Sequence, residues 1–194
     1  MKYTPTSYAA ILIAGLTGSI SLAHAQATGN AGQLTAPNTS AASSLARADR
    51  NFATTAARAG LAEVAEAQIA LQKSNDADIK KFAQRMVDDH SKANAQLTSI
   101  ARAKGLNLPT APSRSDQSEA ERLQKLRGDA FDRRYVSDQT DAHKQAVSLF
   151  TTESKSGKDN DLKSFAAQTL PTLQDHYRMI RSIAGSGNVA SAPK

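Results

Sequence analysis

The sequence predicts an all-α protein that forms an antiparallel four-helix bundle from two helical hairpins. Three observations support this prediction: apolar residues recur at helical spacing in four segments, two of the three connections are short, and the two halves share an internal repeat. The chain has 194 residues, 40% of them hydrophobic, which is enough for one domain with one core. It contains no cysteine, so disulfides, thiolate chemistry and iron–sulfur clusters are excluded.

Each helix is predicted from its apolar stripe and from the residues at its ends. The stripes indicate helices at about 48–73, 76–104, 129–155 and 160–184. A glycine follows each of the last three, where glycine commonly ends a helix: Gly105, Gly157 and Gly185. Pro171 lies inside the fourth segment and should kink it, because proline has no N–H and its ring crowds the preceding turn.

The lengths of the connections predict how the helices are arranged. The links at 74–75 and 156–159 are so short that the helices on either side must run antiparallel. The connection between the second and third helices has more than 20 residues, and its segment 116–126 is a candidate for a short additional helix. A connection of this length can cross the whole bundle, as it does in ferritin-like folds.

An internal repeat supports the division into two hairpins. The residues from Asp49 to Phe52 match those from Asp132 to Tyr135, and the residues from Asp76 to Ala83 match those from Asp159 to Ala166. Both matches have the same offset of 83 residues (49 to 132 and 76 to 159). Because one offset aligns the starts of both helix pairs, the sequence indicates a duplicated helical hairpin.

The two ends of the chain are predicted to lie outside the bundle. Residues 1–25 combine one charged residue, a short apolar stretch and an A-x-A cleavage signal, which is typical of a secretory signal peptide. A membrane anchor is the alternative, but a spanning helix needs about 20 apolar residues and this stretch is shorter. Residues 26–45 are predicted to form a flexible polar leader and 185–194 a flexible tail, so the bundle domain is expected at 46–184.

The chain is basic overall, but its charge is not clustered. It has 24 Lys and Arg against 18 Asp and Glu, and no basic run exceeds two residues. A nucleic-acid-binding surface usually concentrates its charge on one face, so no nucleic-acid partner is expected. The protein is expected in the periplasm after signal cleavage, or peripheral to the outer membrane, with an unidentified protein or envelope component as its partner. The sequence leaves the oligomeric state open.

Three histidines and one glutamate are predicted to meet in the centre of the bundle. His90, His143 and His176 each take a core-facing position near the middle of a helix, and Glu63 lies at the edge of the stripe of the first helix. Within each hairpin the two polar residues differ in depth by only about 6 Å, at ~1.5 Å of rise per residue. Buried imidazoles and carboxylates need a hydrogen bond, a charge or a metal.

Two interpretations of this polar set stay open. Glu63, His90, His143 and His176 could act together as the ligands of one Zn, Mn or Fe ion. They could instead form a structural or proton-sensing network without a metal. A di-iron centre is not expected, because its Glu-x-x-His motif is missing before both His90 and His176.

Other catalytic signals are missing from the sequence. It contains no Gly-x-Ser-x-Gly elbow, no His-Glu-x-x-His motif and no phosphate-binding glycine loop, so an enzyme is not expected. Asp89 and Asp175 precede two of the histidines, but neighbours on a helix point about 100° apart. These acids are therefore expected to face solvent or a neighbouring helix.

A set of spaced residues from all four predicted helices resembles a known family. The set comprises Glu63-Val64, Phe82-Ala83 with Met86-Val87-Asp88-Asp89-His90, Phe131-Asp132 with Tyr135-Val136 and His143, and Leu170-Pro171 with His176. Over about residues 48–182 the chain resembles the exported bacterial "domain of unknown function 4142" family. The resemblance implies a ferritin-like four-helix bundle in the bacterial envelope, with Glu63 and the three histidines at the polar positions of the family. It implies no particular activity.

The sequence therefore favours an exported helical bundle that acts as a binding or envelope-stress protein. One alternative is a mononuclear metal-binding protein for metal storage or redox defence. The other is a pH-responsive interaction module, in which protonation of the core histidines loosens the bundle.

Overall fold

The computed structural model describes residues 45–186, which form five α-helices and the connections between them. The helices are α1 (Arg47–Lys73), α2 (Ala77–Ala103), α3 (Arg114–Lys125), α4 (Gly128–Ser156) and α5 (Asn160–Gly185). The predicted signal peptide (1–25), the predicted leader except its last residue, and the predicted tail beyond Ser186 lie outside the described residues. Within residues 45–186 no helix combines the length and the apolar character that crossing a membrane requires.

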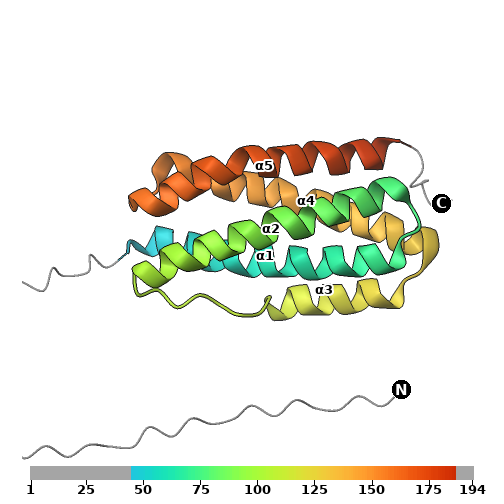
Figure 1. The fold of residues 1–194 in the computed structure, drawn as a ribbon, viewed down its shortest axis with the longest axis horizontal. Coiled ribbons are helices and arrows are strands. Elements are labelled where there is room, and N and C mark those ends of the chain that lie inside the picture. Colours follow the sequence, from blue (N-terminus) through green and yellow to red (C-terminus); the bar gives the residue numbers. More distant parts are fainter. Residues whose placement is uncertain (1–44, 187–194) are drawn as a thin grey trace, which may run out of the picture. The chain divides into compact units, whose positions relative to one another are not determined.

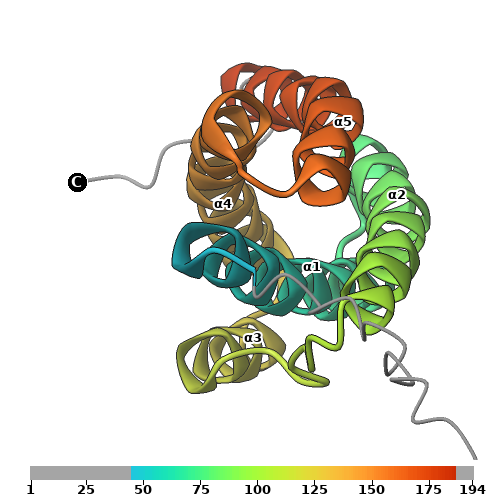
Figure 2. The same cartoon turned by 90° about the vertical axis from the view of Figure 1, so that its left-hand side faces the viewer.

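The helices pack as the predicted bundle of two hairpins. The first hairpin is α1 with α2 and the second is α4 with α5, and in cross-section the helices follow one another in the order α1, α2, α5, α4 (Figure 2). The additional helix predicted at 116–126 forms as α3, which lies along the outer side of α1 (Figure 1). Through α3 the chain passes from the end of α2 to the start of α4 at the opposite end of the bundle. Pro171 lies inside α5, and the helix continues beyond it to Gly185.

The repeat is visible in the capping of the second helix of each hairpin. Asp76 caps α2 and accepts hydrogen bonds from the backbone N–H groups of Asp78 and Ile79, both at 2.9 Å. Asp159 caps α5 in the same way, with bonds of 3.1 and 3.0 Å from the N–H groups two and three residues on. Both helices therefore begin where an aspartate satisfies the first free N–H groups.

Glycine ends α2 and α4 for two different reasons. Gly105 adopts φ 66° after α2, and the N–H of Leu106 reaches back 2.9 Å to the carbonyl of Ala101, which is the Schellman arrangement. Gly157 follows α4 with φ −54°, a conformation open to any residue. A Cβ there would lie 2.6 Å from Oε1 of Glu153. Glycine therefore suits position 157 because a side chain would collide with Glu153, and not because the backbone is left-handed.

Two apolar clusters fill the interior, one toward each end of the bundle. The first gathers the aromatic residues Phe82, Phe131 and Tyr135 with apolar residues of all five helices. The second gathers Phe52, Phe150 and Phe165, whose ring centroids lie 5.1 to 6.4 Å apart. Glu63, His90, His143 and His176 lie buried in the middle of the bundle, between these clusters.

Asp49 fastens α1 to the turn between α4 and α5. Its side chain is 1% exposed, and its two oxygens accept hydrogen bonds from the backbone N–H groups of Lys158 (3.0 Å) and Asp159 (2.8 Å). Asp132 occupies the equivalent position in the second half of the repeat. Its Oδ1 is buried without a hydrogen-bond partner. The two halves therefore share the residue but not the interaction.

The Asp49→Ala variant should lose about 2–3 kcal/mol of unfolding free energy, because two partly buried N–H groups lose a charged acceptor. Asp132→Ala is the matched control and should cost less than about 1 kcal/mol. Urea unfolding followed by circular dichroism measures both values. Equal losses in the two variants would contradict the role assigned to Asp49.

Candidate metal centre

The four polar residues predicted to meet in the core do meet there. Glu63 comes from α1, His90 from α2, His143 from α4 and His176 from α5, and each is between 0% and 5% exposed. The ring centroids of the three histidines lie 5.4 to 5.8 Å from one another. The predicted convergence in the bundle centre is thus confirmed.

The helical repeat places each of these side chains between the two apolar clusters. On α2, for example, Met86 belongs to the first cluster, Leu97 to the second, and His90 lies between them on the same buried face. Residues three or four apart share one face of a helix, so a polar residue at this register points into the core. Because the helices are antiparallel and of similar length, their midpoints lie at the same depth.

Each histidine uses one ring nitrogen for a hydrogen bond. Nδ1 of His90 lies 2.9 Å from Oε2 of Glu63, and Nδ1 of His143 lies 2.9 Å from the backbone carbonyl of Gln139. Nε2 of His176 lies 2.8 Å from Oδ2 of Asp89. Carboxylate and carbonyl oxygens only accept hydrogen bonds, so in each ring the bonded nitrogen carries the proton.

The other nitrogen of each ring is buried and has no hydrogen-bond partner. These atoms are Nε2 of His90, Nε2 of His143 and Nδ1 of His176. One nitrogen from each ring lies within 4.8 Å of one from each of the others. Three nitrogens on one zinc ion would stand about 3.3 Å apart, at ~2.0 Å from the metal, so the rings need to approach by only about 1.5 Å to share an ion.

Burial and charge move the pKa values of this group in opposite directions. Burial alone would raise the pKa of the Glu63 carboxyl, but the neighbouring histidines, His90 above all, lower it to about 2. Burial alone would lower the pKa of His90, but Glu63 raises it above the ordinary value. Burial lowers the pKa of His143, and it lowers that of His176 to about 4 despite Asp89. At neutral pH, His143 and His176 are therefore neutral and can offer lone pairs.

Glu63 lies beside the group that the three histidines form. Within residues 45–186, the group of residues whose ligand atoms all lie within 4.8 Å of one another consists of the three histidines. The carboxylate of Glu63 instead accepts the hydrogen bond of His90, and its other oxygen lies 3.9 Å from Nδ1 of His143. This position suits a group that orients the ligands.

Two residues of the site were not singled out from the sequence. Asp89 reaches His176 from the neighbouring helix, in agreement with the expectation that it faces such a helix, but its link to the site was not foreseen. Gln139 holds His143 through its carbonyl, and its side chain donates to Glu66 at 2.8 Å. Burial raises the pKa of Glu66 to about 7. The position of Gln139 one turn before His143 was the signal that could have identified it.

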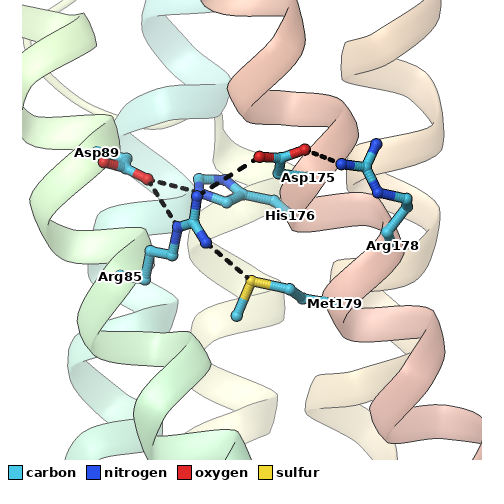
Figure 3. A network of polar contacts seen from close by, with 6 residues as sticks. All are labelled: Arg85, Asp89, Asp175, His176, Arg178 and Met179. Carbon is cyan, nitrogen blue, oxygen red and sulfur yellow. Dashed lines mark hydrogen bonds and ion pairs between the residues drawn. The ribbon is translucent and has the colours of Figure 1, made fainter.

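The outer side of His176 is covered by a surface network between α2 and α5 (Figure 3). Arg85 contacts Asp89 at 3.3 Å and Asp175 at 3.7 Å, and its guanidinium also lies 3.3 Å from the sulfur of Met179. This network ties the acid that holds His176 to both helices and closes the seam between them.

The comparisons with known proteins agree with the helical architecture. A family model described as "Domain of unknown function (DUF4142)" matches residues 34–183. A DUF305 fragment from Deinococcus radiodurans has a TM-score of 0.65 and 13% identity, over 73% of this chain and 97% of its own. A DUF305 protein from Streptomyces coelicolor, described as a "putative secreted protein", has a TM-score of 0.60 and 14% sequence identity. The match covers 70% of this chain and 89% of that protein. CopM in its Cu(I)-bound form has a TM-score of 0.60 and 13% sequence identity. The match covers 72% of this chain and 97% of CopM. No curated protein matches the chain.

Proposed function

The chain belongs to the DUF4142 family, which is defined without an assigned activity, and we propose that this member binds one transition-metal ion between His90, His143 and His176. The observation that carries the proposal is the set of three buried ring nitrogens, one from each of three helices, that have no hydrogen-bond partner. Buried polar atoms normally find a partner, and the three rings are close enough that one nitrogen of each lies within 4.8 Å of one from each of the others. A cation at their centre would satisfy all three together.

The hydrogen bonds around the rings support the same proposal. Histidines that bind metals almost always donate their other N–H to a carboxylate or a carbonyl, which fixes the ring and makes the free nitrogen a better ligand. Each ring here has such an acceptor: Glu63 for His90, the backbone carbonyl of Gln139 for His143 and Asp89 for His176. In this proposal Glu63 orients His90 and completes the site without being one of the three nitrogen ligands.

The donor atoms fit zinc, copper or iron better than manganese. Imidazole suits Zn, Cu, Fe and Ni, whereas Mn prefers carboxylate and water oxygens, which the three-histidine group does not supply. CopM, which shares the fold, is described in a Cu(I)-bound form. We therefore propose Zn²⁺ and Cu⁺ as the first ions to test.

The cell envelope is the proposed location of this metal binding. The N-terminal residues have the pattern of a cleaved signal peptide, and a structural neighbour is described as a "putative secreted protein". A site whose histidines are at most 5% exposed suits sequestration of an ion better than rapid turnover of a substrate. The protein would thus act as a metal-binding protein of the periplasm and not as an enzyme.

Metal titration of the purified, chelator-stripped protein tests the proposal. We expect one equivalent of Zn²⁺, or of Cu⁺ under reducing conditions, with an unfolding free energy higher by about 2.7 kcal/mol when the free metal is 100 times the dissociation constant. His143→Ala should weaken binding at least ~100-fold, and Asp89→Asn by ~10–100-fold, because Asp89 acts through His176.

Glu153→Gln is the matched control for these variants. Glu153 is a buried acid on the same helix as His143, 5% exposed, and lies outside the site. Its substitution should leave metal affinity unchanged. Substoichiometric binding by the folded wild-type protein, or unchanged affinity in His143→Ala, would refute the proposal.

A further inference from the structure

A cavity of about 930 Å³ lies beside the three-histidine site. Its inner wall comes from α2 and α5 and includes His90, and Glu63 lines it from α1. The exposed residues that line it belong to α1 and α4, among them Arg58 and Asp141, so the cavity opens between these two helices. At ~30 Å³ per water molecule this volume corresponds to about 30 waters, which is ample for a hydrated ion.

The internal repeat gives a physical reason for the position of the cavity. The offset of 83 residues pairs each site residue with a counterpart in the other hairpin (63 with 146, 90 with 173, 143 with 60, 176 with 93). The counterparts are Ala146, Leu173, Gly60 and Ala93, and all four line the cavity. The repeat thus relates the carboxylate and the three imidazoles to four positions with small or apolar side chains, which contribute to the wall of the cavity.

The mouth of the cavity carries a surplus of negative charge. Its lining includes Asp116, Glu119, Asp138 and Asp141 from α3 and α4. Among the described residues that line it, Arg58 is the one arginine or lysine. Two arginines nearby pair with lining acids: Arg134 with Glu119 and Asp138, and Arg122 with Glu119. A cleft lined by one sign of charge concentrates ions of the opposite sign and raises their rate of association.

The opposite approach to the histidines is closed by side chains. Between α2 and α5, Asp89 is held against His176 while Arg85 bridges Asp89 and Asp175 across the seam (Figure 3). An ion arriving from this side would have to separate these ion pairs and pass the positive charge of Arg85.

We propose that metal cations reach the three-histidine site through this cavity, attracted by the carboxylates at its mouth and received first by His90. The proposal rests on the proposed function and adds to it the route by which the ion enters. It assigns Asp141, which is exposed at the mouth, a role in the rate of loading and none in holding the bound ion.

Rapid mixing of the metal-free protein with the ion identified by titration, Zn²⁺ or Cu⁺, tests whether the carboxylates at the mouth attract the ion. Asp141→Lys should lower the association rate constant about 5-fold at low ionic strength, and the difference should shrink in high salt because the charges are screened. Asp88→Lys makes the same charge change at an exposed position of α2 that does not line the cavity, and it should stay within about 2-fold of wild type.

Narrowing the cavity tests the route itself. Ala146→Leu should slow uptake and release by similar factors, so that the dissociation constant stays within about 3-fold, because a barrier on the path changes both rates alike. Arg85→Ala removes a bridge across the seam between α2 and α5 and should not make uptake faster. Wild-type rates in both Asp141→Lys and Ala146→Leu, or faster uptake in Arg85→Ala, would overturn the route while metal binding itself stands. A wild-type protein that binds neither ion would overturn the proposed function instead.

Discussion

Replacing Glu63 by alanine is expected to lower the free energy of unfolding by about 3–5 kcal/mol near pH 6, because it leaves the His90 imidazolium buried without its counter-charge. The carboxylate is 5% exposed and lies 2.9 Å from His90 and 3.9 Å from His143. Asp89 also raises the pKa of His90, but its carboxylate is engaged by His176 and Arg85. Chemical denaturation of the metal-free protein measures the loss.

The pH dependence of the Glu63–His90 pair gives this prediction a second measurable part. The pKa of Glu63 is lowered to about 2 in the folded protein, so its contribution is full above its ordinary pKa of about 4.5 and is lost as the pH falls toward 2. The pKa of His90 is raised, so its contribution is full below about 6.5 and is lost as the pH rises through the folded value. The stability difference between wild type and Glu63→Ala should therefore be largest between about pH 4.5 and 6.5.

A double-mutant cycle provides the control for the pair. Glu63→Leu and His90→Leu should each destabilise the protein, whereas the double variant should cost much less than their sum, because apolar residues of similar volume can replace a buried ion pair at little cost. Additive losses, or a stability difference that does not vary between pH 3 and pH 8, would contradict the interaction.

Phe82→Ala is expected to cost about 3–5 kcal/mol of unfolding free energy and to weaken metal binding as well. Phe82 is fully buried in the first apolar cluster, and its ring centroid lies 6.0 Å from that of His143 and 6.2 Å from that of His176. Removing the ring leaves a cavity under two of the three ligands, so both the core and the orientation of these imidazoles should suffer.

Phe52→Ala separates these two effects. Phe52 is 3% exposed in the second apolar cluster, where it packs against Phe150 and Phe165 and not against the histidines. We expect a similar loss of stability with unchanged metal affinity. If Phe82→Ala and Phe52→Ala alter metal affinity equally, then packing against the histidines has no specific role.

Most of the fold could be predicted from the sequence because its signals are local or periodic. Apolar spacing located the four long helices, the aspartates at 76 and 159 marked two helix starts, and the short links implied antiparallel hairpins. The short additional helix appeared where it was proposed. At Gly157 the residue was identified correctly but the reason differed, since crowding by Glu153 depends on how the last turn of α4 packs.

The sequence by itself also determined that four polar side chains would point into the core at matching depth, because direction and rise along a helix follow from residue number alone. Only the tertiary structure decided which partners these side chains find. In the bonds of His176 to Asp89, of Asp49 to the α4–α5 turn and of Glu63 to His90, the register of one element against another brings donor and acceptor atoms within 3 Å. That register, and the cavity left beside the histidines, depend on the packing of whole side chains, which no spacing within one segment encodes.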